Sequence, residues 1–322
     1  MSTVSFFSTV QDGIELVEKR MRAQADEKSH PDLSAALDHL LASGGKRIRP
    51  TLGFLVGNML GSPQDKLVTL GAAVEMLHTA TLVHDDLIDG SLLRRGTPTL
   101  NARWSPAATV LTGDFLFARA AKLAAEADHL PLMKLFAETL AVIVNGELTQ
   151  LFAARGLISR ENYYQRIYAK TASLFEMSAR AAAMVSPADE DVIEAVRVFG
   201  YEIGMAFQIM DDVLDFTGDQ AAIGKPVGSD LLQGLVTLPA LYYLENHPED
   251  DDARLLRDGG WGNRERMERL VNSIRSSDAI RQAVGEARVR VESALEVIEQ
   301  FHVSVERSAL SELAHYIVDR NS

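Results

Sequence analysis

The sequence contains no cysteine among its 322 residues, which excludes disulfide bonds and thiolate metal sites. Proline is sparse, with 10 residues, and runs with the alternating pattern of a β-strand are almost absent. Apolar residues make up 47% of the chain and recur at steps of three and four positions. These features predict an all-α protein with a large apolar core that folds without covalent cross-links.

Signals for secretion and membrane insertion are also missing. The first seven residues lack the basic region and long apolar run of a signal peptide, and we expect no stretch to be apolar enough to span a bilayer. We therefore expect a soluble, cytoplasmic protein. The net charge of -13 argues against nucleic-acid binding. No internal repeat, low-complexity tract or linker is visible, which predicts one domain over residues 1–322.

The apolar period predicts a series of helices. The expected helices cover residues 6–25, a segment ending near 42, 51–60, 66–89, 101–105, 107–127, 132–152, 161–184 and 187–217. After residue 231 the pattern predicts three or four amphipathic helices, broken near residues 246–248 and 259–262. Glu147 and Gln150 are polar positions in an otherwise apolar helix face.

Two aspartate-rich stretches interrupt the apolar background. The pattern Asp-Asp-x-x-Asp occurs at residues 85–89 and again at residues 211–215, each time within a predicted helix. The first and third carboxylates of each motif fall at i and i+4, on one helix face. Carboxylate oxygens suit Mg²⁺, which proteins usually hold through one or two carboxylates and the phosphates of a substrate. The motifs therefore predict Mg²⁺ and a phosphate or diphosphate ester.

The main alternative is that these aspartates form solvated acidic faces or helix caps, which is the usual role of one isolated motif. Two copies weaken this alternative, and neither has polar flanks. Residues 80–83 before the first motif and residues 206–207 before the second are mostly apolar. Because clustered acidic groups in buried surroundings are rarely structural, we favour a metal site.

Basic residues gather at a few positions despite the acidic total. Residues 44–50 place three cations after two glycines and before a proline, a pattern suited to binding an anion at a helix start. Arg94 and Arg95 follow the first motif, and His78 lies two turns before it on about the same face. A glycine-rich loop over residues 218–230, which carries Lys225, has the composition of a lid over a phosphate. Each of the first three features has a structural alternative. Residues 44–50 could be a solvated loop, Arg94 and Arg95 could form salt bridges to the acidic motif, and His78 could be a core histidine.

Taken in order, these motifs resemble those of the trans-isoprenyl (polyprenyl) diphosphate synthases over nearly the whole chain. The matching segments are Gly-Gly-Lys-x-x-Arg-Pro at residues 44–50, the two aspartate motifs, Arg94-Arg95, Lys170-Thr171, Phe207-Gln208 and Gly-Lys-Pro-x-Gly-x-Asp at residues 224–230. The resemblance implies a single-domain antiparallel helical bundle of the isoprenoid synthase type around a central apolar cavity. It also implies a homodimer that condenses isopentenyl diphosphate with an allylic diphosphate, using three Mg²⁺ ions per active site.

The resemblance assigns roles residue by residue. Isopentenyl diphosphate would be held by Lys46, Arg49, His78 and Arg95. The allylic diphosphate would be contacted by Arg94, Lys170, Thr171, Gln208 and Lys225. The metal ligands would be Asp85, Asp89, Asp211 and Asp215, and the catalytic set would be Asp85, Asp86, Asp89, Lys170, Asp211 and Asp212. One position departs from the pattern, since Leu235 stands where many relatives carry a lysine, so that one phosphate contact is missing or supplied elsewhere.

Product length depends on the residues one turn below the first metal motif. Here they are Ala80 and Thr81, which are too small to form a floor, so the growing chain is expected to continue past Leu77. Short-chain relatives usually carry bulky aromatic residues there. We expect an all-trans product of C30–C50, of the kind used for quinone side chains, which contacts the membrane transiently on release. A short-chain synthase of C15–C20 products is the alternative.

Three other functions compete with this interpretation. A terpene cyclase or head-to-head coupling enzyme would not need Lys46 and Arg49, because such enzymes do not bind isopentenyl diphosphate. A non-catalytic subunit of a heteromeric synthase would typically lack some motif aspartates, whereas this chain keeps all six. A structural protein with Ca²⁺-binding acidic clusters would leave the basic residues unexplained.

Overall fold

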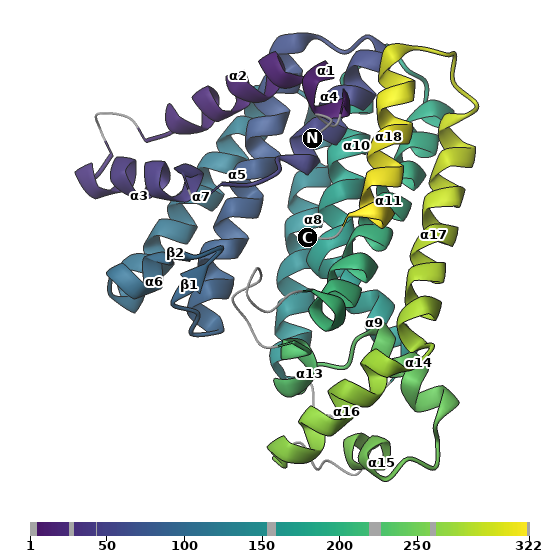
Figure 1. Cartoon of the computed structure of the whole chain (residues 1–322). Helices are drawn as coiled ribbons and strands as arrows, with labels where there is room; N and C mark the ends of the chain where they lie inside the picture. Colours follow the sequence, from purple (N-terminus) through teal and green to yellow (C-terminus); the bar gives the residue numbers. More distant parts are fainter. Residues whose placement is uncertain are drawn as a thin grey trace. The chain divides into compact units, whose positions relative to one another are not determined.

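The computed structural model describes residues 5–25, 29–42, 44–152, 159–218, 227–257 and 262–320 (Figure 1). The chain divides into two compact units. Unit 1 comprises Met1–Thr139, Leu174–Gly200 and Ile298–Glu312, and unit 2 comprises Leu140–Ser173, Tyr201–Val297 and Leu313–Ser322. The all-α class predicted from the apolar period is confirmed, because helices account for most of the described residues.

Unit 1 is built from the N-terminal helices and one very short hairpin. Its own elements are α1 (Ser5–Thr9), α2 (Gln11–Arg22), α3 (Pro31–Ala42), α4 (Ile48–Leu60), α5 (Gln64–Ile88), β1 (Leu93–Arg94), β2 (Thr97–Pro98), α6 (Leu100–Arg103) and α7 (Pro106–Glu126). The strands pair antiparallel, with Leu93 opposite Pro98 and Arg94 opposite Thr97. This hairpin follows directly on the first aspartate motif and gives the Arg94-Arg95 pair a defined geometry.

Helix α5 forms the core of unit 1. It packs against α2, α4 and α7 (Figure 1), and Ala72, Ala73, Met76 and Leu77 on it are completely buried. By length and composition α5 alone among the described helices would be able to cross a membrane, whereas the sequence predicted no such stretch. Since 67% of its most apolar window is buried inside the protein, its hydrophobicity is explained by a core position.

Unit 2 contains shorter helices and one π-helical turn. Its own elements are α9 (Arg160–Ile167), the π-helix η1 (Tyr168–Ala172), α13 (Ser229–Leu232), α14 (Leu238–Asn246), α15 (Asp251–Arg257) and α16 (Arg264–Ser276). Helix α14 packs on α9, and α16 packs on α13, α14 and α15. The helices that contribute residues to both units are α8 (Leu130–Phe152), α10 (Ser173–Met184), α11 (Glu190–Thr217), α17 (Ala279–Ile298) and α18 (Val305–Asp319).

Several predicted helix boundaries were wrong for identifiable reasons. The helix expected at 187–217 begins at Glu190, because the Asp189 carboxylate accepts a hydrogen bond from the Val192 backbone at 3.0 Å and caps the helix. The helix expected at 161–184 is interrupted by the π-helix η1. The sequence did not predict this interruption, because one wider turn does not alter the apolar period. In the described part of the chain after residue 235 there are five helices, α14 to α18, one more than the largest number predicted.

Candidate active site

The first aspartate motif lies at the end of α5 in unit 1, and its middle carboxylate points inward. Asp86 is 8% exposed. Both of its oxygens accept hydrogen bonds from Arg94 Nε at 3.0 Å, and Arg94 Nη2 lies 2.9 Å from Oδ1. Asp85 is partly exposed and Asp89, the C-cap of the helix, is exposed. Arg94 on β1 therefore fixes the hairpin to the motif, and Asp85 and Asp89 are the more accessible carboxylates.

The basic loop, residues 44–49, runs into the first turn of α4 and is held from two sides. Arg47 adopts a left-handed backbone conformation with φ of +48°. Its Nη1 lies 3.1 Å from Glu75 Oε1 on α5, and its Nε lies 3.0 Å from Glu18 Oε1 on α2. On the other side, Arg95 Nη1 donates to the Gly44 carbonyl at 2.5 Å. These contacts position the loop relative to α5 and to the hairpin, while the Lys46 side chain is exposed.

His78 lies on α5, where burial and the charges of nearby arginines lower its pKa. Burial is the largest cause of a pKa well below the ordinary value of 6.5, and the positive charges of Arg49, Arg94, Arg95 and Arg47 lower this pKa further. His78 is thus neutral at neutral pH. The guanidinium of Arg49 also stacks on the ring of Phe175, 4.8 Å from its centroid. Unit 1 therefore gathers three of the four predicted isopentenyl diphosphate ligands, Arg49, His78 and Arg95, near one another.

The residues predicted to control product length lie on α5 below the motif. Leu77 and Ala80 are completely buried. Thr81 is partly exposed, and its hydroxyl donates to the His78 carbonyl at 2.7 Å within the same helix. A large side chain at Thr81 would therefore meet less resistance from the core than one at Ala80.

The second aspartate motif lies on the part of α11 that belongs to unit 2, and its middle carboxylate is again buried. Asp212 is 4% exposed. It accepts hydrogen bonds from the Tyr163 hydroxyl and from Gln208 Nε2, each at 2.8 Å. The Thr171 hydroxyl donates to Gln208 Oε1 at 2.6 Å. Burial, reinforced by the nearby charge of Asp230, raises the pKa of the Asp212 carboxyl to about 7.

The outer aspartates of the second motif have different partners. Asp211 is 41% exposed and forms a 2.7 Å ion pair with Arg320. The carboxylate of Asp215 accepts hydrogen bonds from the Ser229 hydroxyl at 2.7 Å and from the Asp230 backbone at 3.2 Å. Asp215 thereby ties the end of α11 to the start of α13.

The π-turn places Lys170 beside α8. Lys170 Nζ lies 3.2 Å from Glu147 Oε1. The helices approach closely here because position 146 is glycine, where an added Cβ would lie 2.4 Å from the Ala169 Cβ. Lys170 and Thr171 therefore extend from a turn of unusual geometry, a feature often found at functional sites.

Residues 225 and 235 are the remaining positions expected to bear on phosphate binding. Lys225 lies outside the described residues. Leu235, which stands at the expected lysine position, is partly exposed, and its backbone N–H donates to the Asp230 carbonyl at 2.9 Å. The neighbouring chain is thus fixed by its backbone, whatever side chain residue 235 carries.

Three residues in contact with the motifs were missed by the sequence analysis. Tyr163 and Arg320 carry no local signal, because each meets its aspartate only through tertiary packing. Glu147 was visible as a polar position in an apolar helix face, and that signal would have been enough to nominate it.

The donor set of the motifs fits Mg²⁺ when a diphosphate is bound. No group of three or more His, Asp or Glu side chains suited to a metal ion occurs among the described residues. Each motif carries carboxylates at positions i and i+4 of one helix. Mg²⁺ is usually bound by one or two carboxylates, with phosphate oxygens and water completing its shell, so this donor set matches the ion.

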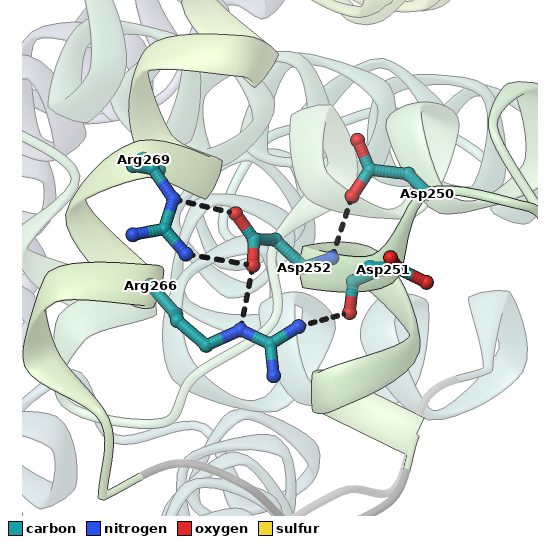
Figure 2. Close-up of a pocket in the computed structure, with 5 residues that line it drawn as sticks. All are labelled: Asp250, Asp251, Asp252, Arg266 and Arg269. Carbon is teal, nitrogen blue, oxygen red and sulfur yellow. Dashed lines mark hydrogen bonds and ion pairs between the residues drawn. The ribbon is translucent and has the colours of Figure 1, made fainter.

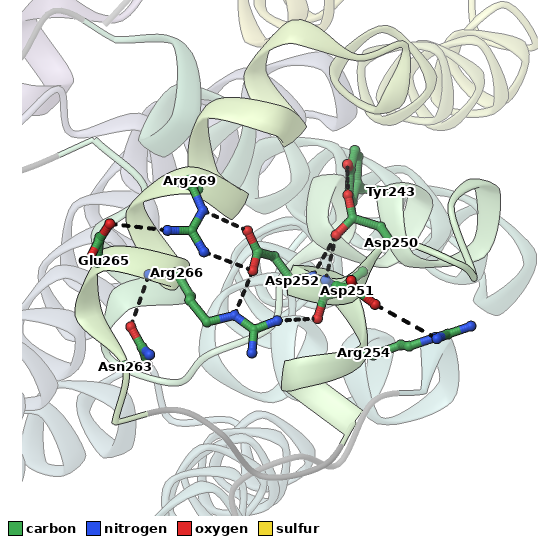
Figure 3. A network of polar contacts seen from close by, with 10 residues as sticks. Tyr243, Asp250, Asp251, Asp252, Arg254, Asn263, Glu265, Arg266 and Arg269 are labelled. Carbon is green, nitrogen blue, oxygen red and sulfur yellow. Dashed lines mark hydrogen bonds and ion pairs between the residues drawn. The ribbon is translucent and has the colours of Figure 1, made fainter.

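Unit 2 also contains a polar hollow, lined by Asp250, Asp251, Asp252, Arg266 and Arg269 (Figure 2). The carboxylate of Asp252 is held by Arg266 Nε at 2.6 Å and by Arg269 Nε at 3.0 Å. The carboxylate of Asp250 caps α15 and accepts the Tyr243 hydroxyl at 2.7 Å (Figure 3). This network joins the start of α15 to α16, which is a structural role.

Comparisons with known proteins agree with the motifs. A family model described as polyprenyl synthetase matches residues 30–274. Heptaprenyl diphosphate synthase component 2 of Bacillus subtilis is 35% identical over 315 residues, which cover 98% of this chain and 90% of that protein. Octaprenyl diphosphate synthase of Haemophilus influenzae is 37% identical over 286 residues, covering 88% and 87% of the two chains.

A solved structure extends the likeness to three dimensions. The polyprenyl synthase from Caulobacter crescentus, complexed with calcium and isoprenyl diphosphate, matches with a TM-score of 0.91 and 33% identity over 99% of this chain and 98% of that one. An all-α fold with this pair of motifs defines a trans-prenyltransferase. The chain belongs to the polyprenyl synthetase family, since the family model covers most of its length.

Proposed function

We propose that this chain is a Mg²⁺-dependent prenyltransferase that condenses isopentenyl diphosphate head to tail with an allylic diphosphate. The observation that carries the proposal is in unit 1, where α5 ends in the first aspartate motif, Arg94 binds Asp86 of that motif at 2.9 Å, and Arg95 holds the basic loop through the Gly44 carbonyl. Carboxylates for a metal ion and cations for a diphosphate thus occur together. A diphosphate substrate accounts for both.

The roles of individual residues follow the chemistry of their side chains. Lys46, Arg49, His78 and Arg95 would bind isopentenyl diphosphate, and Arg94, Lys170, Thr171, Gln208 and Lys225 would contact the allylic diphosphate. Asp85, Asp89, Asp211 and Asp215 would hold Mg²⁺, three ions in all with substrate bound. When bound, Mg²⁺ would stabilise negative charge on the departing diphosphate.

The middle aspartates have a different part in this proposal. Asp86 would orient Arg94, which it binds through both oxygens. Asp212 would orient Gln208, which in turn accepts from Thr171. Fixed donors of this kind need no reorganisation when the allylic carbon–oxygen bond breaks. The isopentenyl double bond then attacks the allylic carbon, and the proton released goes to the departed diphosphate.

We propose a long product, of C30–C50, with quinone side chains as its destination. Ala80 and Thr81 leave no aromatic floor one turn below Asp85, and the names of the heptaprenyl and octaprenyl relatives support the same conclusion. Each added isoprene unit buries five carbons, about 4 kcal/mol at ~0.8 kcal/mol per carbon, so long products should leave slowly. We further propose a cytoplasmic homodimer that contacts the membrane transiently while releasing its product.

A second candidate is supported by the name of the Bacillus subtilis relative, which is component 2 of a heptaprenyl diphosphate synthase. This chain would then require a partner protein for full activity. The six motif aspartates favour a catalytic role even within such an assembly.

The deciding experiment incubates the purified chain with Mg²⁺, labelled isopentenyl diphosphate and farnesyl diphosphate, and separates the dephosphorylated products by chromatography. Products reaching C30 or beyond are expected. A stop at C15–C20 would keep the chemistry and reject the long product. No incorporation by the chain alone, with incorporation restored by a second protein, would establish the two-component alternative.

Asp85→Ala and Asp211→Ala should each lose orders of magnitude in turnover with the fold intact, and wild-type rates would reject the metal role.

A further inference from the structure

Arg320, directly after α18, is a buried arginine in contact with the second aspartate motif. Its side chain is only 5% exposed, which is unusual because arginine is almost never buried unless it is paired. Nη2 lies 2.7 Å from Asp211 Oδ1 and also donates to the Phe207 carbonyl at 2.7 Å. The guanidinium carbon stands 3.9 Å from the centroid of the Phe207 ring.

These contacts fix the position of the guanidinium. One nitrogen binds both a side chain and a backbone carbonyl, and the two partners lie one turn apart on α11, at i and i+4. Stacking on the Phe207 ring fixes the plane of the guanidinium as well. The Asp211 carboxylate is consequently held against a rigid donor.

Stability alone gives a poor account of this arrangement. The ion pair contributes little net stability, because the buried guanidinium loses its hydration and this cost offsets its attraction to the part-exposed Asp211. In addition, Arg320 Nε is buried and has no hydrogen-bond partner among the described residues, which is a further cost. What the pairing does supply is a fixed orientation of the Asp211 carboxylate.

We propose that Arg320 is a positioning residue for Asp211. It holds this carboxylate in the orientation needed for the Mg²⁺ that accompanies the allylic diphosphate. The inference rests on the proposed function for the identity of the ion and the substrate. It predicts that a residue outside all the family motifs controls metal affinity at the second motif.

The test measures metal binding directly. Free Mn²⁺ is followed by electron paramagnetic resonance while it is titrated into the protein with inorganic diphosphate present. Arg320→Gln should weaken the Asp211-dependent part of Mn²⁺ binding about tenfold and raise the Mg²⁺ concentration for half-maximal turnover by a similar factor. Arg320→Lys, which keeps the charge but loses the planar fork, should fall between the wild type and Arg320→Gln.

Arg281 provides a matched control in the same unit. It forms an exposed ion pair with Asp278 three residues away, so Arg281→Gln should leave Mn²⁺ binding unchanged. If Arg320→Gln does not fold, Phe207→Leu, which removes only the stacking surface, should still weaken Mn²⁺ binding. Variants with lower melting temperatures but wild-type Mn²⁺ affinity would overturn the proposal and leave Arg320 a structural residue.

Failure of the proposed function is distinguishable from failure of this inference. If the wild type incorporates no isopentenyl diphosphate but Mn²⁺ binding still depends on Arg320, the positioning role stands and the reaction is wrong. If the wild type is active and Arg320→Gln retains both wild-type Mn²⁺ affinity and wild-type Mg²⁺ dependence, the reaction stands and the positioning role is wrong.

Discussion

The guanidinium of Arg47 lies 3.1 Å from the carboxylate of Glu75, and the two side chains are only 10% and 6% exposed. This contact ties the basic loop to the core helix α5. Lys46 and Arg49 lie close to Arg47 in sequence, so the buried pair fixes the backbone from which these two proposed diphosphate ligands extend. Arg47 itself is therefore a structural residue, next to residues proposed to bind substrate.

We predict that Arg47→Met lowers the free energy of unfolding by about 3–5 kcal/mol, because it leaves Glu75 charged, buried and without this partner. The double variant Arg47→Met with Glu75→Met should recover most of that loss, since an apolar pair of similar size replaces the ion pair. Urea unfolding measures both. Arg20→Met, which breaks the more exposed pair with Glu126, should cost less than about 1 kcal/mol. Equal losses in the Arg47 and Arg20 variants would contradict the assignment.

His78 should make the protein sensitive to mild acid. Its pKa in the folded state is lowered, chiefly by burial, so below about pH 6.5 the unfolded chain binds a proton that the folded chain does not. Stability therefore falls as the pH falls from 6.5 toward the folded pKa, with a slope of up to about 1.4 kcal/mol per pH unit. Urea midpoints at pH 7.5 and pH 5.5 should differ less in His78→Gln than in the wild type. An identical pH dependence in the two proteins would show that His78 is protonated equally in both states.

Product length should respond to Thr81. Thr81→Phe places an aromatic ring one turn below the motif, where it should shorten the main product to C15–C20. Thr69→Phe is the matched control, because Thr69 lies on the same helix and likewise donates its hydroxyl to its own helix, at 2.9 Å. Chromatography of the dephosphorylated products measures the chain length that each variant makes, and Thr69→Phe should make the wild-type length. Ala80→Phe should act similarly but with a loss of about 1–3 kcal/mol from overpacking, since Ala80 is completely buried. An unchanged product in Thr81→Phe would place the growing chain elsewhere.

Gly146 should prove essential for the position of the π-turn. In Gly146→Ala the new methyl would lie 2.4 Å from the Ala169 Cβ, so α8 and η1 must separate. We expect a loss of about 1–3 kcal/mol and a raised KM for the allylic diphosphate, because Lys170 and Thr171 move with the turn. Gly285→Ala is the control, since nothing lies within 4 Å of its added Cβ on α17. That substitution should stabilise the protein by about 0.5–1 kcal/mol. The prediction fails if both variants behave alike.

Patterns of short range could be predicted from the sequence. The all-α class follows from a period of 3.6 residues, which leaves its mark on every amphipathic helix. The spacing of Asp85 and Asp89 on one helix face follows from the same geometry. The cations of residues 44–50 were likewise visible, because their chemistry depends only on residue type and order. The π-turn at Lys170 was not visible, since a single wider turn leaves the apolar pattern intact.

Tertiary structure decided which aspartate of each motif is buried and which is accessible. The sequence by itself determined that three aspartates occur in each motif, but it treats them alike. Packing buries Asp86 against Arg94 and Asp212 against Tyr163, and it brings Arg320 to Asp211. Tyr163 and Arg320 reach their aspartates only when segments far apart in the sequence fold together, whereas Arg94 reaches Asp86 through the hairpin that follows the motif. Burial then decides which carboxylate is enclosed and which is accessible. No local pattern records that choice, because it depends on desolvation and on hydrogen-bond partners supplied by the rest of the fold.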